Sequence, residues 1–407
     1  MTALSMANAT IQSIVDAVTS AVIPRASRQT SHYTIQSTSR QDFAISGSTR
    51  DFHYLVVADG HGHRLNGMLI PTLLKSYDWA TLLCNSNFYK TDKDARGNHI
   101  SPLFRDIKGL VGPDRGDKLC NQGSTLSIVK IYPDRFECFW IGDSTIKIYA
   151  ETDDSRAAAA AAAAAATDVP SVSANAAKTM TAISTAAINA TDASGITIMS
   201  ANTVNRQFSC IMESENHNMS HAEDMQRLKR RSKQERMWCR QLWKTTNGIT
   251  TKNVWSLHVL SPKKITMVPH CYVDFDDGTS INMTRSIGHI PDYKTIASAK
   301  ELGIELSLAQ QTLTTRTIAR DKNVKYCVLA ATDGLWDITC ARDDNIFTTL
   351  MAEGHIATAA KYIAQFAKRR WAQTWTQVYK GHDDTKTAMP RYSHDDIGVA
   401  IWSSPSP

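Results

Sequence analysis

The chain has 407 residues, of which 42% are hydrophobic and 21% charged, and its formal net charge is +6. This length permits one large domain or two ordinary ones, and so mild a charge does not by itself favour a nucleic-acid-binding protein. The eight cysteines form no CxxC pair, and no apolar run is long enough to span a bilayer. We therefore expect a soluble cytoplasmic or nuclear protein with reduced thiols.

Residues 1–30 are expected to form an N-terminal extension, and residues 31–407 a single domain. Short runs rich in β-branched and aromatic residues predict strands over 42–46, 52–59, 124–132, 135–142, 145–150, 324–332 and 393–402. Apolar residues at helical spacing predict helices over 65–85, 343–355 and 355–375. Strands, then helices, then more strands indicate an α+β sandwich and not a regular βαβ alternation.

Two stretches interrupt this pattern. Residues 151–206 contain ten consecutive alanines within a Ser/Thr-rich sequence that offers no apolar face, so we predict a mobile insertion between two strands. Residues 227–244 are strongly basic and contain Trp238 and Trp243. They are interpreted as a solvated helix whose tryptophans dock on the domain, or as a surface for an acidic or phosphorylated partner. Nucleic acid is the third and least favoured ligand.

Acidic residues recur where the predicted strands begin or end. An isolated Asp in such a place is usually a turn residue that caps local N–H groups. In "VVADGHGH" the Asp, with His61 and His63, could be a metal site, an acid–base pair or a polar turn. Several carboxylates gathered in one place repel one another unless a cation neutralises them, and oxygen-only ligation favours Mg²⁺ or Mn²⁺. The acidic residues in question are Asp42, Asp59, Asp143, Asp333, Asp395 and Asp396.

Seven segments, in the same order along the chain, resemble the metal-dependent Ser/Thr protein phosphatases of the PPM, or type 2C, family. They are "VVADGHGH", "NQGSTLSIV", "WIGDSTIKIY", "HNMSHAEDMQRL", "INMTRSIGH", "LAATDGLWD" and "SHDDIGVAIW". The resemblance implies two antiparallel sheets flanked by helix pairs, in four layers α-β-β-α, with a dinuclear metal site at one end of the sandwich. Residues 228–283 are longer than the flap that the family has at this place, so we expect an enlarged basic flap there.

The resemblance further implies a hydrolase that dephosphorylates phosphoserine and phosphothreonine in proteins. A hydroxide that bridges two Mn²⁺ or Mg²⁺ ions would attack phosphorus, and His61 would protonate the leaving oxygen as general acid. A third, weaker ion is also implied. The residues that match the family's metal site are Asp59, the Gly60 carbonyl, Asp333, Asp395 and Asp143, with Asp42 ordering metal-bound waters. We expect a monomer that acts on phosphoproteins and does not bind membranes.

Some positions depart from the family pattern and leave a second function open. The usual phosphate-binding Arg is Ser37 here, and Arg40 is the candidate substitute for substrate binding. The usual Glu is Gln41, and Asp396 replaces Asn. These changes motivate the alternative of a weakly active or inactive pseudophosphatase that serves as a binding scaffold. An unrelated metal-binding or nucleic-acid module is the third alternative, and it leaves most of the motifs unexplained.

Overall fold

The computed structural model describes residues 29–37, 39–62, 69–89, 92–93, 99–100, 103, 122–154, 207–217, 221, 251–261, 263–274, 280–281, 283, 285–288, 313–352, 356–378, 385–388 and 394–405. The predicted extension (except its last two residues), nearly all of the predicted insertion, the basic segment 227–244 and His63 lie outside these residues.

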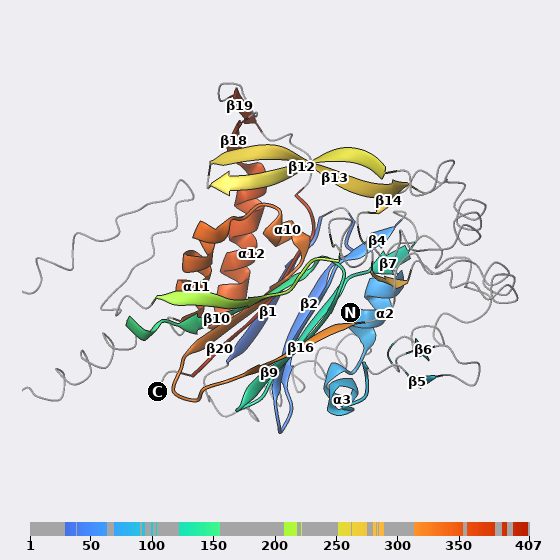
Figure 1. The fold of residues 1–407 in the computed structure, drawn as a ribbon, viewed down its shortest axis with the longest axis vertical. Coiled ribbons are helices and arrows are strands. Elements are labelled where there is room, and N and C mark those ends of the chain that lie inside the picture. The colour runs from blue at the N-terminus through green and yellow to red at the C-terminus, as the bar shows by residue number, and fades with distance from the viewer. Residues whose placement is uncertain are drawn as a thin grey trace, which may run out of the picture.

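Two five-stranded antiparallel sheets form the centre of the molecule (Figure 1). The first sheet contains, in spatial order, β1 (Thr30–Ile35), β20 (Ile397–Ser403), β17 (Tyr326–Ala331), β10 (Thr145–Glu151) and β11 (Phe208–Glu213). The second contains β16 (Thr314–Ala319), β9 (Arg135–Ile141), β8 (Leu126–Ile131), β3 (His53–Ala58) and β2 (Phe43–Ser48). All seven predicted strands are present. Strands β1, β11 and β16 of these two sheets were not predicted, and each of them is an edge strand.

Central strands such as β3, β17 and β20 are apolar on both faces, because each sheet is covered on both sides. In β17, Val328 packs into the core between the two sheets, whereas Leu329 packs against the helices. In β8, Val129 faces the other sheet and Ile128 faces the opposite way. This alternation follows from the two-residue period of a strand. Such burial on both faces produces the continuous apolar runs of the sequence.

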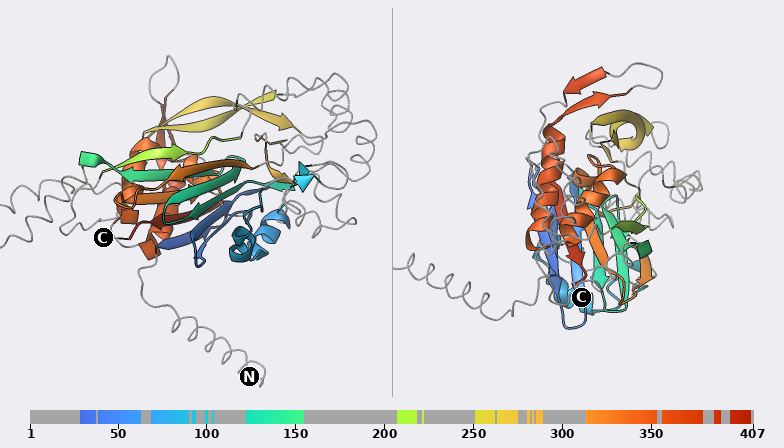
Figure 2. Two further views of the ribbon diagram at one scale, coloured as in Figure 1. Left: turned by 60° about the horizontal axis from the view of Figure 1, so that its bottom comes forward. Right: turned by 90° about the vertical axis from the view of Figure 1, so that its left-hand side faces the viewer.

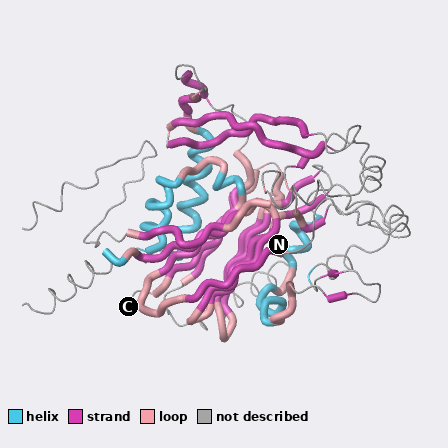
Figure 3. The backbone as a smooth tube through the Cα atoms, viewed as in Figure 1, coloured by secondary structure: helices cyan, strands magenta, loops and turns pink. Residues whose placement is uncertain are grey.

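Helices cover the outer face of each sheet. The helices α10 (Asp333–Trp336), α11 (Asp344–Ala352) and α12 (Ile356–Ala372), with the 3₁₀ turn η2 (Ala341–Asp343), pack on the first sheet. The helices α2 (Leu69–Ser76) and α3 (Trp79–Cys84) pack on the second. The tube in Figure 3 shows the strands stacked between the helices. The predicted α-β-β-α sandwich is confirmed.

Smaller strand groups adjoin the sandwich. Strands β15 (Ile287–Gly288), β7 (Gln122–Ser124) and β4 (Gly60–Gly62) form a three-stranded sheet at one end. A long hairpin of β12 (Thr251–Ser261) and β13 (Lys264–Asp274) lies apart from the two main sheets, as the views in Figure 2 show. It pairs with β14 (Ser280–Ile281) and β18 (Thr374–Gln377), which pairs with β19 (Thr385–Ala388). The remaining strands are β5 (Asp92–Lys93) and β6 (His99–Ile100).

This hairpin is the largest described part of the predicted flap, and Val259 and Ile265 attach it to the core beside the first sheet. Within the described residues, no helix is long and apolar enough to cross a membrane. Among the described cysteines, no disulfide joins Cys84, Cys138, Cys210, Cys327 and Cys340.

Candidate metal centre

The strand register brings the predicted carboxylates to one end of the sandwich. Asp59 follows β3, Asp143 follows β9, and Asp333 follows the last residue of β17 by two positions. The start of β2 pairs with the end of β3 through Phe43 and Ala58. The start of β20 likewise pairs with the end of β17. Asp42 and Asp395, which precede β2 and β20, therefore lie at the same end.

Three carboxylates come close enough to share a cation. One oxygen each from Asp59, Asp143 and Asp333 lies within 4.8 Å of the others. Asp395 is outside this group of three, but its charge repels the charges of Asp59 and Asp333. Asp42 is buried, and its carboxyl group shares a hydrogen bond with that of Asp59 when one of them is protonated. Asp59, Asp143 and Asp333 thus form the inner cluster, with Asp42 and Asp395 beside it.

The pKa values of these carboxyl groups show that their negative charges repel one another. Burial, and then repulsion from Asp42 and Asp333, raises the pKa of Asp59 well above its ordinary range. Burial and repulsion from Asp143 raise the pKa of Asp333 to about 7. The pKa of Asp395 is raised to about 7 by the same two effects, with Asp333 as the nearby charge. Without a cation, these carboxyl groups therefore keep their protons to a higher pH than an exposed Asp does.

The donor set suits a hard divalent cation. All the candidate side chains at the centre of the cluster offer carboxylate oxygens, which is the ligand type that Mg²⁺ and Mn²⁺ prefer. A divalent cation would remove the repulsion that raises these pKa values, so the residues fit the predicted metals. Asp337, at the end of α10, was not among the predicted ligands. Repulsion from Asp333, Asp143 and Asp395 adds to desolvation in raising its pKa, so its carboxylate is within electrostatic reach of the cluster.

Asp337 could have been found from the sequence. Its backbone N–H donates to the Asp333 carbonyl at 2.8 Å, so the two residues are one helical turn apart. A D-x-x-x-D spacing on a short helix places both carboxylates on the same face.

The "GST" motif holds the backbone of Asp59. Thr125 donates its N–H to the Asp59 carbonyl at 2.8 Å, and its Oγ1 accepts the Asp59 N–H at 2.9 Å. The Ser124 hydroxyl donates to the same carbonyl at 3.0 Å. The Oγ atoms of Thr125 and Ser144 are 2.5 Å apart, which joins this motif to the turn that carries Asp143. The sequence resemblance marked these motifs without indicating which backbone they hold.

Glycines allow the segments of the site to approach one another. A Cβ on Gly334 would overlap the Asp396 backbone carbonyl, so α10 can contact the start of β20 only with glycine here. A Cβ on Gly60 would overlap the ring of Pro71. Gly60 also donates its N–H to the Gln41 carbonyl at 3.2 Å. This bond ties the "DGHG" segment to the loop that precedes Asp42.

His61 lies in β4 beside the cluster, and both of its ring nitrogens are buried. Burial lowers the pKa of His61 to about 4, although a hydrogen bond with the backbone of Asp59 opposes this effect. The imidazole is therefore neutral at pH 7 in the ligand-free protein. A negatively charged ligand beside the ring would raise this pKa.

Asp396 binds residues 37, 39 and 41 of the segment 37–41, which contains Ser37 and Gln41, two of the departures from the family pattern; residue 38 lies outside the described part. Its carboxylate accepts the backbone N–H of Ser37, the Ser39 hydroxyl at 2.8 Å and the backbone N–H of Gln41 at 2.7 Å. Arg40 is exposed and has a left-handed backbone, with φ of 56°. The Ser37 hydroxyl is 2.6 Å from the Ser39 hydroxyl. Asp396 is therefore a loop anchor, a role that the sequence comparison did not indicate.

No known family profile and no curated protein sequence matches this chain. Among solved structures, a sex determining protein of C. elegans is 14% identical, with a TM-score of 0.48 over 97% of this chain and 71% of that one. Serine-threonine phosphatase 2C of Toxoplasma gondii is 11% identical, with a TM-score of 0.43 over 92% and 94%. The Mycobacterium tuberculosis serine/threonine phosphatase PstP/Ppp is 12% identical, with a TM-score of 0.38 over 93% and 99%. The structural neighbours thus include PP2C-type serine/threonine phosphatases, the family that the motifs resemble.

Proposed function

We propose that this chain is a metal-dependent protein phosphatase that hydrolyses phosphoserine and phosphothreonine residues. The observation that carries the proposal is the convergence of Asp59, Asp143 and Asp333, whose carboxylate oxygens lie within 4.8 Å of one another. These residues come from three separate strand ends, and burial together with the nearby carboxylates raises the pKa values of Asp59 and Asp333. A purely structural turn would not require several carboxylates to face each other in this way.

Asp59, Asp143, Asp333 and Asp395, with the Gly60 carbonyl, would hold the cations, and Asp42 would accept hydrogen bonds from water beside Asp59. Bound Mn²⁺ or Mg²⁺ would ionise a water for attack on phosphorus and offset the charge of the phosphate oxygens. The chain itself then has to orient the phosphate and supply a proton to the leaving oxygen. No cysteine or serine nucleophile is needed for this chemistry.

His61 is the proposed proton donor. A general acid works best when its pKa is close to the working pH, and about 4 is too low for that in the ligand-free protein. A phosphate dianion beside the ring would raise the pKa of His61 toward neutrality. The imidazole would then carry its proton only when substrate is bound.

The phosphoprotein substrate would meet the loop 37–41, which Asp396 holds next to Asp42. Arg40 is the cationic residue of this loop, and its exposed position leaves it accessible to a phosphate group. This assignment makes Arg40 a substitute for the arginine that the family has at the place of Ser37. The basic segment 227–244 is a further candidate contact for an acidic or phosphorylated partner.

One observation supports a second candidate function, that of a scaffold with little or no turnover. Ser37 stands where a phosphate-binding cation is expected. Its backbone N–H already donates to the Asp396 carboxylate, and its hydroxyl is hydrogen-bonded to that of Ser39. In a scaffold, the same carboxylates would bind metal without efficient hydrolysis.

A single assay separates the two functions. The full chain is incubated with a phosphothreonine peptide and Mn²⁺ or Mg²⁺, and phosphate release is compared with that in EDTA and with that of Asp333→Asn. Asp51→Asn, an exposed change in the β2–β3 turn at the other end of the sandwich, is the matched control. Metal-dependent release that is lost only in Asp333→Asn supports the phosphatase. Metal binding without turnover supports the scaffold, and no metal binding refutes both.

A further inference from the structure

Asp143, a member of the inner cluster, is carried by a turn between two strands. Strand β9 ends at Ile141 and β10 begins at Thr145, so Asp143 lies in the connection between them. The preceding Gly142 has φ of 93°, and a Cβ there would be 2.6 Å from Thr125 Cγ2. A turn of this kind needs other contacts to fix the direction of its side chains.

His217 supplies two such contacts to Gly142. The backbone N–H of His217 donates to the Gly142 carbonyl at 2.9 Å. In return, the Gly142 N–H donates to Nδ1 of the His217 ring at 3.2 Å. The residue therefore holds both peptide groups of Gly142, directly before Asp143. Its side chain is almost fully buried, with 1% exposed.

The other ring nitrogen is also engaged. Because Nδ1 accepts the Gly142 N–H, the neutral ring carries its proton on Nε2 and donates it to Thr314 Oγ1 at 2.8 Å. Arg285 Nη1 donates to the same hydroxyl oxygen at 3.1 Å. The His217 ring thus connects the turn after β9 to the first residue of β16.

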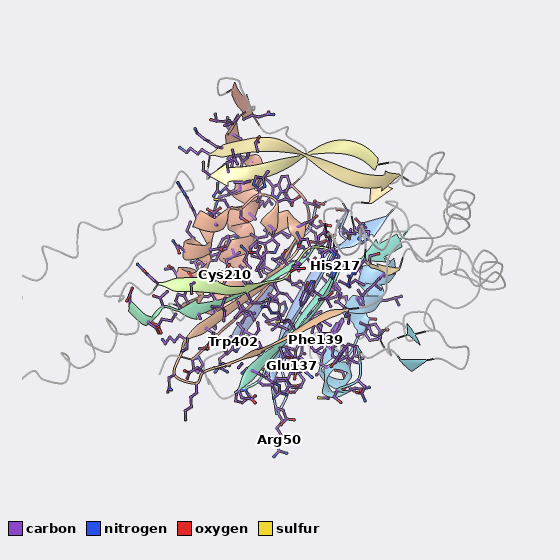
Figure 4. All side chains as sticks on the ribbon, in the orientation of Figure 1. Arg50, Glu137, Phe139, Cys210, His217 and Trp402 are labelled. Atoms are coloured by element: carbon purple, nitrogen blue, oxygen red, sulfur yellow. The ribbon has the colours of Figure 1, made fainter. Side chains whose placement is uncertain are left out.

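The neighbouring segment is fastened along the same strands. The His217 ring stacks on Trp140, with 6.3 Å between centroids and 9° between planes. The Trp140 indole N–H donates to the Glu215 carbonyl at 2.9 Å. The Thr145 hydroxyl donates to Asn216 Oδ1 at 3.0 Å, on the other side of Asp143. Figure 4 shows His217 at the end of the sandwich that carries β4 and β7, whereas Glu137 and Arg50 lie toward the other end.

We propose that His217 is a positioning residue that aims the Asp143 carboxylate at Asp59 and Asp333. It acts through the two hydrogen bonds to Gly142, with its own ring fixed by Thr314 and Trp140. The hydrogen bonds that His217 makes to Gly142 do not depend on a metal, whereas their effect on metal affinity rests on the proposed function. The two parts are tested by separate measurements.

The first measurement needs no metal. In His217→Asn, the amide oxygen stands near the former Nδ1 and can still accept the Gly142 N–H. In His217→Gln, the amide group stands near the former Nε2 and leaves that N–H without its acceptor. Both variants lose the ring that stacks on Trp140, so each is the matched control of the other. The Gly142 amide in EDTA should exchange with D₂O about fivefold faster in the Gln variant than in the Asn variant, since one hydrogen bond contributes about 1 kcal/mol.

The second measurement is a calorimetric titration with Mn²⁺ alone. His217→Gln should bind Mn²⁺ about tenfold more weakly at the Asp143-dependent site, and His217→Asn should retain most of the affinity. In an Asp143→Asn background, the Asn and Gln variants at 217 should bind Mn²⁺ equally, because the group through which His217 acts has been removed.

Two results would overturn the proposal. One is equal exchange of the Gly142 amide in the Asn and Gln variants, and the other is a difference in Mn²⁺ affinity between them that persists in the Asp143→Asn background. If the wild-type chain binds no Mn²⁺, the proposed function fails. The exchange measurement still decides whether His217 holds the turn.

Discussion

Asp333→Asn should stabilise the metal-free protein, although it should abolish activity. Asp333 faces Asp59 and Asp143, and these charges repel one another in a site that water only partly reaches. Asn has nearly the same shape and can still accept the backbone hydrogen bond that Asp333 receives from Gly334. The substitution therefore removes a charge and changes little else.

The size of the effect follows from the pKa. Burial and repulsion raise the pKa of Asp333 from 3.8 to about 7. At about 1.4 kcal/mol per pKa unit, this difference corresponds to about 4 kcal/mol in the free energy of unfolding. The surrounding carboxyl groups share the repulsion and water screens part of it, so we expect a gain of about 1–2 kcal/mol.

The gain should depend on pH in a defined direction. The folded state keeps a proton on Asp333 up to about pH 7, whereas the unfolded chain loses it near 3.8. Between about pH 4 and pH 7, the folded wild-type protein binds more protons at Asp333 than the unfolded chain does. The free energy of unfolding of the wild-type protein therefore falls as the pH rises through this range. Asn has no proton to lose. The advantage of the variant should therefore be small at pH 4 and complete above pH 7.

Urea denaturation at pH 5 and pH 8 in EDTA measures the effect, with Asp51→Asn as the control. Mn²⁺ at about 100 times its dissociation constant should add about 2.7 kcal/mol to the wild-type protein and much less to Asp333→Asn, which reverses the order of stability. If Asp333→Asn and Asp51→Asn are equally stable at pH 8 in EDTA, the repulsion inferred from the structure does not exist.

Four further substitutions test the site. Gly334→Ala should lower the free energy of unfolding by about 3 kcal/mol, because its Cβ would overlap the Asp396 carbonyl; an unchanged urea midpoint would contradict this packing. Asp396→Ala should raise KM for a phosphothreonine peptide and lower the melting temperature through three lost hydrogen bonds, with Asp396→Asn between it and wild type. Ser37→Arg should lower KM, and an unchanged KM would show that another group already holds the phosphate. His61→Ala should reduce kcat by about 10²–10⁴-fold; a parallel loss of Mn²⁺ affinity, followed by calorimetry, would make His61 a ligand instead.

The apolar patterns were sufficient to predict the central strands and the main helices. Strands such as β17 and β20 are covered on both faces, so their sequences are almost continuously apolar and stand out from the turns around them. The edge strands β11 and β16 have several exposed residues, and their weaker patterns were missed. The hairpin β12–β13 was placed in a flap, without its strands, for lack of a comparable signal.

The residues of the candidate site were also only partly predictable from the sequence. The acidic residues at strand ends, together with the order of the motifs, were enough to nominate Asp59, Asp143 and Asp333 as one site. Asp337 was missed although it follows Asp333 by one helical turn, because the same D-x-x-x-D spacing also occurs on ordinary surface helices. The anchoring role of Asp396 depends on backbone N–H groups more than 350 residues away in the chain, which no local pattern reveals.

The sequence alone determined which residue types end the strands and how many apolar layers the chain can build, because local burial imposes its period directly on the chain. Only the tertiary structure decided which carboxylates face one another, how far burial and repulsion raise their pKa values, and which hydrogen bonds hold the turns that carry them. These properties depend on distances between segments remote in the chain, and those distances are set by strand register and by the close contacts that Gly60, Gly142 and Gly334 allow.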